Sequence, residues 1–150
     1  MKIRFVSVLV AVLAIAPSAC AGGSRKAPAA PSSTCPAAGS EVSFGKMMNP
    51  TFSGEYEGCS IRTTVKFWSA TSMMAANIGD AESVVFEVSD PNVGEGSYEY
   101  VKMAKASAAA IFGLKKGDAI VLTGGTHAWP TGGAKTHYFE ASAVAPAAAP

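Results

Sequence analysis

The chain has 150 residues, enough for one folded domain and too few for two of ordinary size. Its 12 basic and 11 acidic residues give a formal net charge of +1. Four of the basic residues precede residue 40 and all of the acidic residues follow it, which leaves the remainder with 8 basic against 11 acidic residues, a net charge of −3. A domain of this charge lacks the basic stripe that neutralises phosphates, so the composition predicts that nucleic acid is not a partner.

The N-terminus is typical of a secretory signal. Lys2 and Arg4 give a positive start, and residues 5–16 form an apolar segment that is too short to span a bilayer. Small residues around Cys20 follow this segment. The sequence therefore predicts an exported protein, with residues 1–19 as the signal peptide.

Two forms of cleavage fit the residues after this apolar segment. Small residues at Ala19 and Ala21 suit ordinary cleavage after Ala21, which removes Cys20 and leaves a soluble periplasmic or secreted protein. Small residues followed by a cysteine also resemble the bacterial lipobox, although Pro17 stands where that motif has leucine. The lipobox resemblance implies that Cys20 becomes the lipidated first residue and attaches the protein to a membrane of the bacterial cell envelope.

Residues 20–40 are rich in Ala, Pro, Ser and Gly, a composition that predicts a tether rather than a folded segment. Such a tether suits a domain that is held at a membrane. Whichever cleavage takes place, Cys35 and Cys59 remain in the mature chain. In an oxidising compartment we expect these two cysteines to form a disulfide.

Residues 41–145 are expected to form the folded domain, which is made mostly of strands. Apolar and polar side chains alternate over residues 59–70, and this alternation predicts a half-buried strand. It puts Trp68 on the outer face of the strand. The inner face receives three apolar side chains: Ile61, Val65 and Phe67.

Four further strands and one short helix are expected after a loop at residues 71–82. The predicted strands, which are rich in β-branched or aromatic residues, are 83–89, 97–103, 118–124 and 137–145. An alanine run favours a helix over residues 104–114, and its apolar side chains would cover an open end of a barrel: Ile111, Phe112 and Leu114. Gly117 is expected to need a positive φ in the turn that follows, and residues 146–150 to form a disordered tail.

The element order β-β-β-α-β-β, with a Leu-Lys-Lys-Gly-Asp turn at residues 114–118 before the fourth strand, resembles the OB-fold. The resemblance covers about residues 41–145 and is one of topology and turn placement. The chain is similar to small exported bacterial OB-fold lipoproteins of unassigned role. The predicted fold class is all-β with one short helix, in a five-stranded antiparallel Greek-key barrel, and the alternative is a small β-sandwich.

The sequence carries no catalytic motif. It has no nucleophile elbow, zinc-protease helix motif, phosphate-binding loop or Rossmann glycine pattern. We therefore expect a binding module, with neither enzymatic activity nor a bound cofactor.

The OB-fold resemblance implies a ligand face on the second and third strands, between the loops that follow strands one and four. Those loops are residues 71–82 and 126–136. Trp68 precedes the first loop, Trp129 lies in the second, and Tyr138 follows the second. Aromatic side chains at such positions stack on sugars or bases, or anchor a protein partner, and a protein or glycan ligand is favoured here. The alternative for Trp68 is a packing role against the helix or the lead-in segment.

A metal-binding alternative rests on two histidines. If the last hairpin turns at Gly132, His127 and His137 face each other with Cβ atoms about 5 Å apart, close enough to share a metal. Together with the methionines of the chain, this pair suits copper, as in a periplasmic copper chaperone with an OB-fold. The Trp-Pro-x-Met-x-Met run of that family is not matched after Trp129 and Pro130. Without a metal, the histidines form a cross-strand pair and the methionines fill the core.

Overall fold

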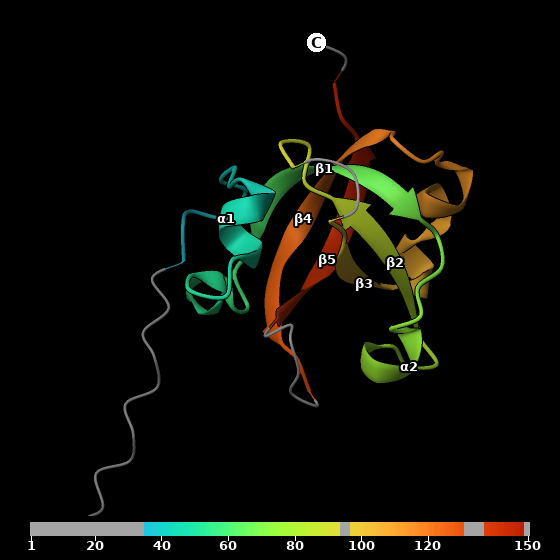
Figure 1. Ribbon diagram of the computed structural model, residues 1–150, viewed down its shortest axis with the longest axis horizontal. Coiled ribbons are helices and arrows are strands. Elements are labelled where there is room, and N and C mark those ends of the chain that lie inside the picture. Colours follow the sequence, from blue (N-terminus) through green and yellow to red (C-terminus); the bar gives the residue numbers. More distant parts are fainter. Residues whose placement is uncertain (1–34, 94–96, 131–136, 149–150) are drawn as a thin grey trace, which may run out of the picture. The chain divides into compact units, whose positions relative to one another are not determined.

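The computed structural model describes residues 35–93, 97–130 and 137–148, and within these ranges the chain forms five strands. The strands are β1 (Ile61–Ser69), β2 (Ser83–Ser89), β3 (Glu99–Ala104), β4 (Ala119–Ala128) and β5 (His137–Pro146). They close into a barrel in the order β1-β2-β3-β5-β4 (Figure 1). β3 and β5 run parallel, and the other neighbouring pairs run antiparallel. This order confirms the predicted Greek-key barrel of OB type over the β-sandwich.

Alternation along the strands fills the barrel with apolar side chains. β1 shows the predicted pattern, because Ile61, Val65 and Phe67 are buried while Trp68 lies on the outer face in a half-buried position. The other strands add further fully buried side chains to the same core: Phe86, Val88, Val101, Met103, Ile120, Leu122 and Phe139. The first strand was therefore predictable from its period of two residues.

Two of the later strands are longer than predicted. β4 continues to Ala128 and β5 to Pro146. The backbone N–H of Ala147 also donates to the carbonyl of Ala119, so the ordered structure extends into the segment expected to be a tail. The predicted signal peptide, Cys20 and the turn at Gly132 lie outside the described residues.

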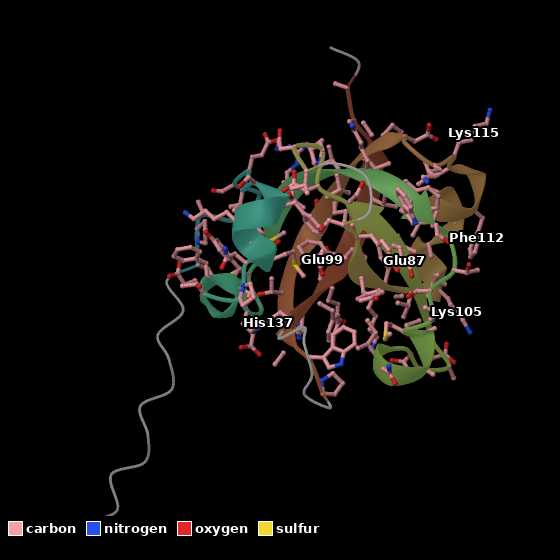
Figure 2. The ribbon with its side chains drawn as sticks, viewed as in Figure 1. Glu87, Glu99, Lys105, Phe112, Lys115 and His137 are labelled. Carbon is pink, nitrogen blue, oxygen red and sulfur yellow. A yellow bond between two sulfur atoms is a disulfide. The ribbon has the colours of Figure 1, made fainter. Side chains whose placement is uncertain are left out.

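The segment between β3 and β4 is not the α-helix that the alanine run predicted. It forms two 3₁₀ segments, η2 (Lys105–Ser107) and η3 (Ala109–Gly113). Backbone bonds that span three residues link Ala108, Ile111 and Leu114 in turn, and a period of three places these side chains on one side. Ile111 is therefore buried in the core, whereas Phe112 is 66% exposed, and its predicted packing role is wrong (Figure 2).

The lead-in segment is ordered and begins earlier than predicted. Cys35 and Cys59 form the expected disulfide. Residues 35–40, assigned by composition to the tether, lie against β1, because Gly39 N–H donates to the Ser60 carbonyl and Arg62 N–H donates to the Ser40 carbonyl. The lead-in then forms α1 (Phe44–Met48) and η1 (Ser53–Tyr56). The ring of Phe44 packs edge-on against the ring of Phe139, with 6.4 Å between the ring centroids.

The disulfide closes a loop over a sequence separation of 24 residues. Loss of such a closure is expected to lower the free energy of unfolding by roughly 3 kcal/mol, because the unfolded chain gains freedom. Denaturant unfolding of the mature protein, with and without reductant, measures this loss. A Cys35→Ala variant should unfold as the reduced protein does and should not respond to reductant; an unchanged midpoint on reduction would contradict the prediction.

Gly117 adopts the expected positive φ, at +95°, in the turn before β4. A β-branched side chain resists this backbone region, so Gly117→Val is expected to cost on the order of 1 kcal/mol or more. The matched control is Gly113→Val, because Gly113 also faces open space but has no positive φ. The thermal midpoint should fall clearly for Gly117→Val and little for Gly113→Val, and equal losses would argue against a role for the φ angle.

Candidate ligand-binding face

Among the described residues, six ring side chains form a continuous band across the outside of the barrel. This aromatic band consists of Trp68, Tyr98, Tyr100, Trp129, Tyr138 and His127. Successive ring centroids lie 5.7–6.1 Å apart, in stacked, tilted and edge-on arrangements. Because each such pair contributes about 0.5–1.5 kcal/mol beyond its burial, the rings hold one another in place.

The strand order brings these rings together from distant parts of the sequence. A register shift between Phe67 and Ser69 makes Trp68 a bulged residue of β1, and a bulge re-aims the side chain that it carries. Trp68 stacks on Tyr98, which lies just before β3, with 15° between the ring planes. On the other side, the parallel pairing of β3 with β5 brings Tyr100 next to the rings of β5 and of the segment that follows β4.

A small apolar cluster supports the middle of the band. Ile78, the last residue of α2 (Ala75–Ile78), is buried with Val85 and Tyr138, and Tyr100 and Trp129 pack against these residues. The loop between β1 and β2 therefore borders the aromatic band, as the OB-fold resemblance implied.

An ion pair fixes the same loop to β3. The Asp80 carboxylate lies 2.8 Å from Lys102 Nζ. The hydrogen bond from Lys102 lowers the pKa of Asp80 below its ordinary value, and the same bond raises the pKa of Lys102. The pair is partly exposed, so its role is to position the loop rather than to add much stability.

One carboxylate, Glu87, lies beside the middle of the aromatic band, and another, Glu140, lies beside its end on β4 and β5. Burial raises the pKa of Tyr100, and the nearby Glu87 and Glu99 raise it further. Glu87 is the cross-strand partner of Tyr100 and shares its face, whereas Glu99 lies on the other face of β3 and lines a pocket beside α1 (Figure 2 labels both). Burial also raises the pKa of Tyr138, with a further contribution from Glu140, whose carboxylate lies 3.3 Å from His127 Nε2.

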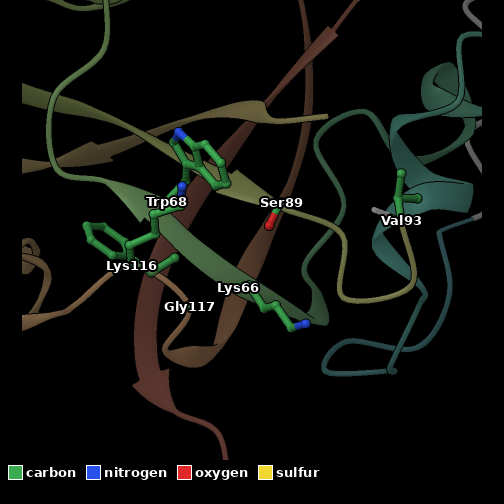
Figure 3. A pocket seen from close by; sticks show the side chains of 7 residues that line it. Lys66, Trp68, Ser89, Val93, Lys116 and Gly117 are labelled. Carbon is green, nitrogen blue, oxygen red and sulfur yellow. The ribbon is translucent and has the colours of Figure 1, made fainter. Parts of the chain in front are cut away.

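The end of the band on β1 has the opposite charge. Lys116 Nζ lies 3.3 Å from the centroid of the Trp68 ring, a cation–π contact. Lys116 and Trp68 line a cavity of about 330 Å³ together with Lys66, Ser89 and Val93 (Figure 3). The aromatic band therefore joins a lysine-lined pocket to a surface that carries the carboxylates of Glu87 and Glu140.

The structure brings the three predicted face residues, Trp68, Trp129 and Tyr138, into one band. Trp68 covers neither the helix nor the lead-in segment, since it lies between Tyr98 and Lys116. Tyr98 and Tyr100 were missed as site residues, although they fall in a predicted strand. Tyr98 and Tyr100 are two residues apart, and Val101, which lies between Tyr100 and Lys102, is buried. This alternation was the signal that could have placed both tyrosines on the outer face of the strand.

The predicted pairing of His127 with His137 is wrong by one position. β4 and β5 pair His127 with Tyr138, and Ala128 with His137. Paired residues share a side of the sheet and successive residues alternate, so the two histidines point to opposite faces. His127 stacks on Tyr138 in the band, whereas His137 Nδ1 lies 2.7 Å from Ser53 Oγ.

This geometry gives no support to a copper site shared by the two histidines. Within the described ranges, no group of three or more His, Cys, Asp or Glu side chains is placed to hold a metal ion. In the same ranges, no helix is long and apolar enough to cross a membrane.

No protein-family model matches the chain, and no curated protein matches it. Among solved structures, the chain is similar to a small single-stranded DNA-binding protein from Streptomyces coelicolor. The two share 14% sequence identity over 61% of this chain and 94% of that chain, with a TM-score of 0.40. At this identity the similarity concerns the fold.

This finding contradicts the prediction that nucleic acid is not a partner, since the similar protein binds single-stranded DNA. The prediction is wrong because it rested on net charge alone. Net charge does not describe the surface on which a ligand lies: Lys66 and Lys116 flank Trp68 in a domain whose total charge is negative.

Proposed function

We propose that this protein is a lipid-anchored binding module outside the cytoplasm, without catalytic activity, and that its ligand is a glycan bound along the aromatic band. The observation that carries the proposal is the band itself, six rings in mutual contact on the outer face of the barrel. Five of the six rings are half-buried and Tyr138 is buried, so the band presents the edges and faces of partly exposed rings. Tyr and Trp side chains, with an apolar body and a polar tip, are enriched at interaction surfaces. The non-enzymatic role is inferred from the sequence, which lacks a catalytic motif.

The groups around the rings favour a sugar chain. One face of a pyranose ring carries C–H groups and packs on an aromatic ring, while its hydroxyl groups project sideways as hydrogen-bond donors. Glu87 and Glu140 lie on the same face of the barrel as Tyr100 and Tyr138, close enough to raise their pKa values. Carboxylates at this distance are suited to accept hydrogen bonds from sugar hydroxyls, because each ionised carboxylate offers two acceptor oxygens.

Export and anchoring are supported by features at the N-terminal side. The Cys35–Cys59 disulfide is compatible with an oxidising compartment. The residues before Cys35 have the composition of a tether and begin at Cys20, the proposed lipidation site. A domain held in this way would present its aromatic band to a polymer of the cell envelope.

The aromatic band predicts that glycan binding depends on Tyr100 and Trp129. The mature protein should bind members of an array of cell-envelope oligosaccharides, and Tyr100→Ala or Trp129→Ala should weaken binding about tenfold or more, since each stacking contact is worth roughly 1–3 kcal/mol. Phe112→Ala is the matched control, because this exposed ring lies outside the band (Figure 2). Circular dichroism checks that each variant is folded.

An oligothymidylate on the same array tests the other class of ligand. If the oligonucleotide binds and every oligosaccharide fails, the glycan assignment is wrong and the aromatic band serves nucleic acid. If Phe112→Ala weakens glycan binding as much as Tyr100→Ala does, the ligand lies elsewhere.

Anchoring is expected to depend on Cys20. Replacing Cys20 by Ser removes the thiol that would carry the lipid, so the variant should move from the membrane fraction to the soluble fraction after cell breakage. Mass spectrometry of the mature wild-type N-terminus provides the control, since it should show a lipid-modified Cys20. A wild-type protein that is already soluble would contradict the anchor.

A further inference from the structure

The pocket at the Trp68 end of the aromatic band contains two cationic groups. Lys66 lies on β1 and Lys116 in the turn before β4. Within the described ranges, neither ammonium group has an ion-pair partner, whereas Lys102 on the same face is paired with Asp80. Two unpaired positive charges beside one cavity favour an anionic group, particularly in a domain with an excess of acids.

The position of Lys116 is fixed by the backbone. Gly117 N–H donates to the Phe67 carbonyl at 2.8 Å, and Phe67 N–H donates to the Asp118 carbonyl at 2.8 Å. The turn is thus paired with β1 immediately before the bulge at Trp68. This pairing fixes the backbone next to Lys116, whose ammonium group contacts the Trp68 ring.

Ser89 adds a hydroxyl group to the same wall. Ser89 and Lys66 are cross-strand partners, so their side chains leave the sheet on the same face. Ser89 is 8% exposed, and Figure 3 shows its oxygen on the cavity side between Trp68 and Lys66. The pocket therefore offers two ammonium groups, a hydroxyl group and the indole of Trp68.

We propose that this pocket binds the carboxylate-bearing sugar of an acidic glycan, such as a uronic acid residue, while neighbouring sugars lie on the rest of the aromatic band. The inference rests on the proposed function and names the substrate class of the same site. A cavity of about 330 Å³ lies at the lower end of small-molecule sites and accommodates one sugar ring rather than a longer segment. The cation–π contact draws the Lys116 ammonium group to the Trp68 ring but does not neutralise its positive charge. The charge of Lys116 is therefore available to attract the ligand.

A singly charged carboxylate suits the pocket better than a more highly charged group. Glu87 lies opposite Tyr100 across the β2–β3 pair, two rings along the band from Trp68. This carboxylate opposes additional negative charge in the ligand, and the opposition grows with that charge. The two lysines therefore match one carboxylate with neutral sugars beside it.

The test compares a uronic-acid-terminated oligosaccharide with its carboxyl-reduced, neutral counterpart, by calorimetric titration of the mature protein. The acidic form should bind about tenfold more tightly, as expected for a charge-assisted hydrogen bond. Lys66→Met and Lys116→Met should each reduce this preference several-fold, because each removes one of the two positive charges beside the cavity. Methionine keeps the apolar stem that packs on Trp68, so loss of charge is separated from loss of contact.

Lys115→Met is the matched control, because it makes the same change of charge in the same turn. Lys115 does not line the pocket, and Figure 2 shows it directed away from the barrel. This variant should keep the full preference for the acidic form. Equal loss in Lys115→Met and Lys116→Met would mean that net charge alone sets the preference, which would overturn the proposal.

The remaining outcomes separate this inference from the proposed function. If wild type binds the acidic and neutral oligosaccharides equally, the carboxylate site is wrong and the glycan-binding function stands. If neither oligosaccharide binds, both are wrong. If inorganic phosphate or oligothymidylate displaces the acidic oligosaccharide at the same or lower concentration, the pocket is a phosphate site and the carboxylate assignment is overturned.

Discussion

The binding face depends on the parallel pairing of β3 with β5. Val101 lies opposite Phe139 and Met103 opposite Ala141, and this register closes the barrel. Because the two strands are neighbours, Tyr100 on β3 reaches Trp129 and so the rings of the last hairpin. Without this pairing, the rings would form two separate groups, one on β1 and β3 and the other on β4 and β5.

Mutual contact between the rings determines how the face would bind. Trp68 has Tyr98 on one side and Lys116 close to its ring, and Tyr138 has His127 and Trp129 as neighbours. Side chains held in this way lose little conformational entropy when a ligand arrives, so more of the contact energy is available for affinity. The arrangement also explains why large aromatic side chains are tolerated on the outer surface of the barrel, because each ring covers part of the apolar surface of the next ring.

The sequence predicted the strands better than the contacts between them. A period of two residues located β1 and the outward Trp68, and turn chemistry located Gly117 with its positive φ. The predicted pairing of His127 with His137 was wrong because it assumed a turn centre that differs by one residue position from the observed register. A shift of one residue moves every side chain of a strand to the other face of the sheet. The predicted α-helix is wrong because the alanine run indicates only helical propensity, whereas the 3₁₀ period brings Ile111 into the core.

The disulfide sets the path of mechanical load. Cys59 stands two residues before β1, and Cys35 precedes α1 and η1 in the chain. A pulling force that reaches Cys35 from the N-terminal side passes through the sulfur bridge directly to the start of β1, and α1 and η1 lie in the closed loop that carries none of it. β1 is hydrogen-bonded on both edges, to β2 and to β4, so a force that reaches its first residue acts on two ladders. For as long as the bridge remains oxidised, the loop that contains α1 and η1 lies outside the path of a force applied at Cys35.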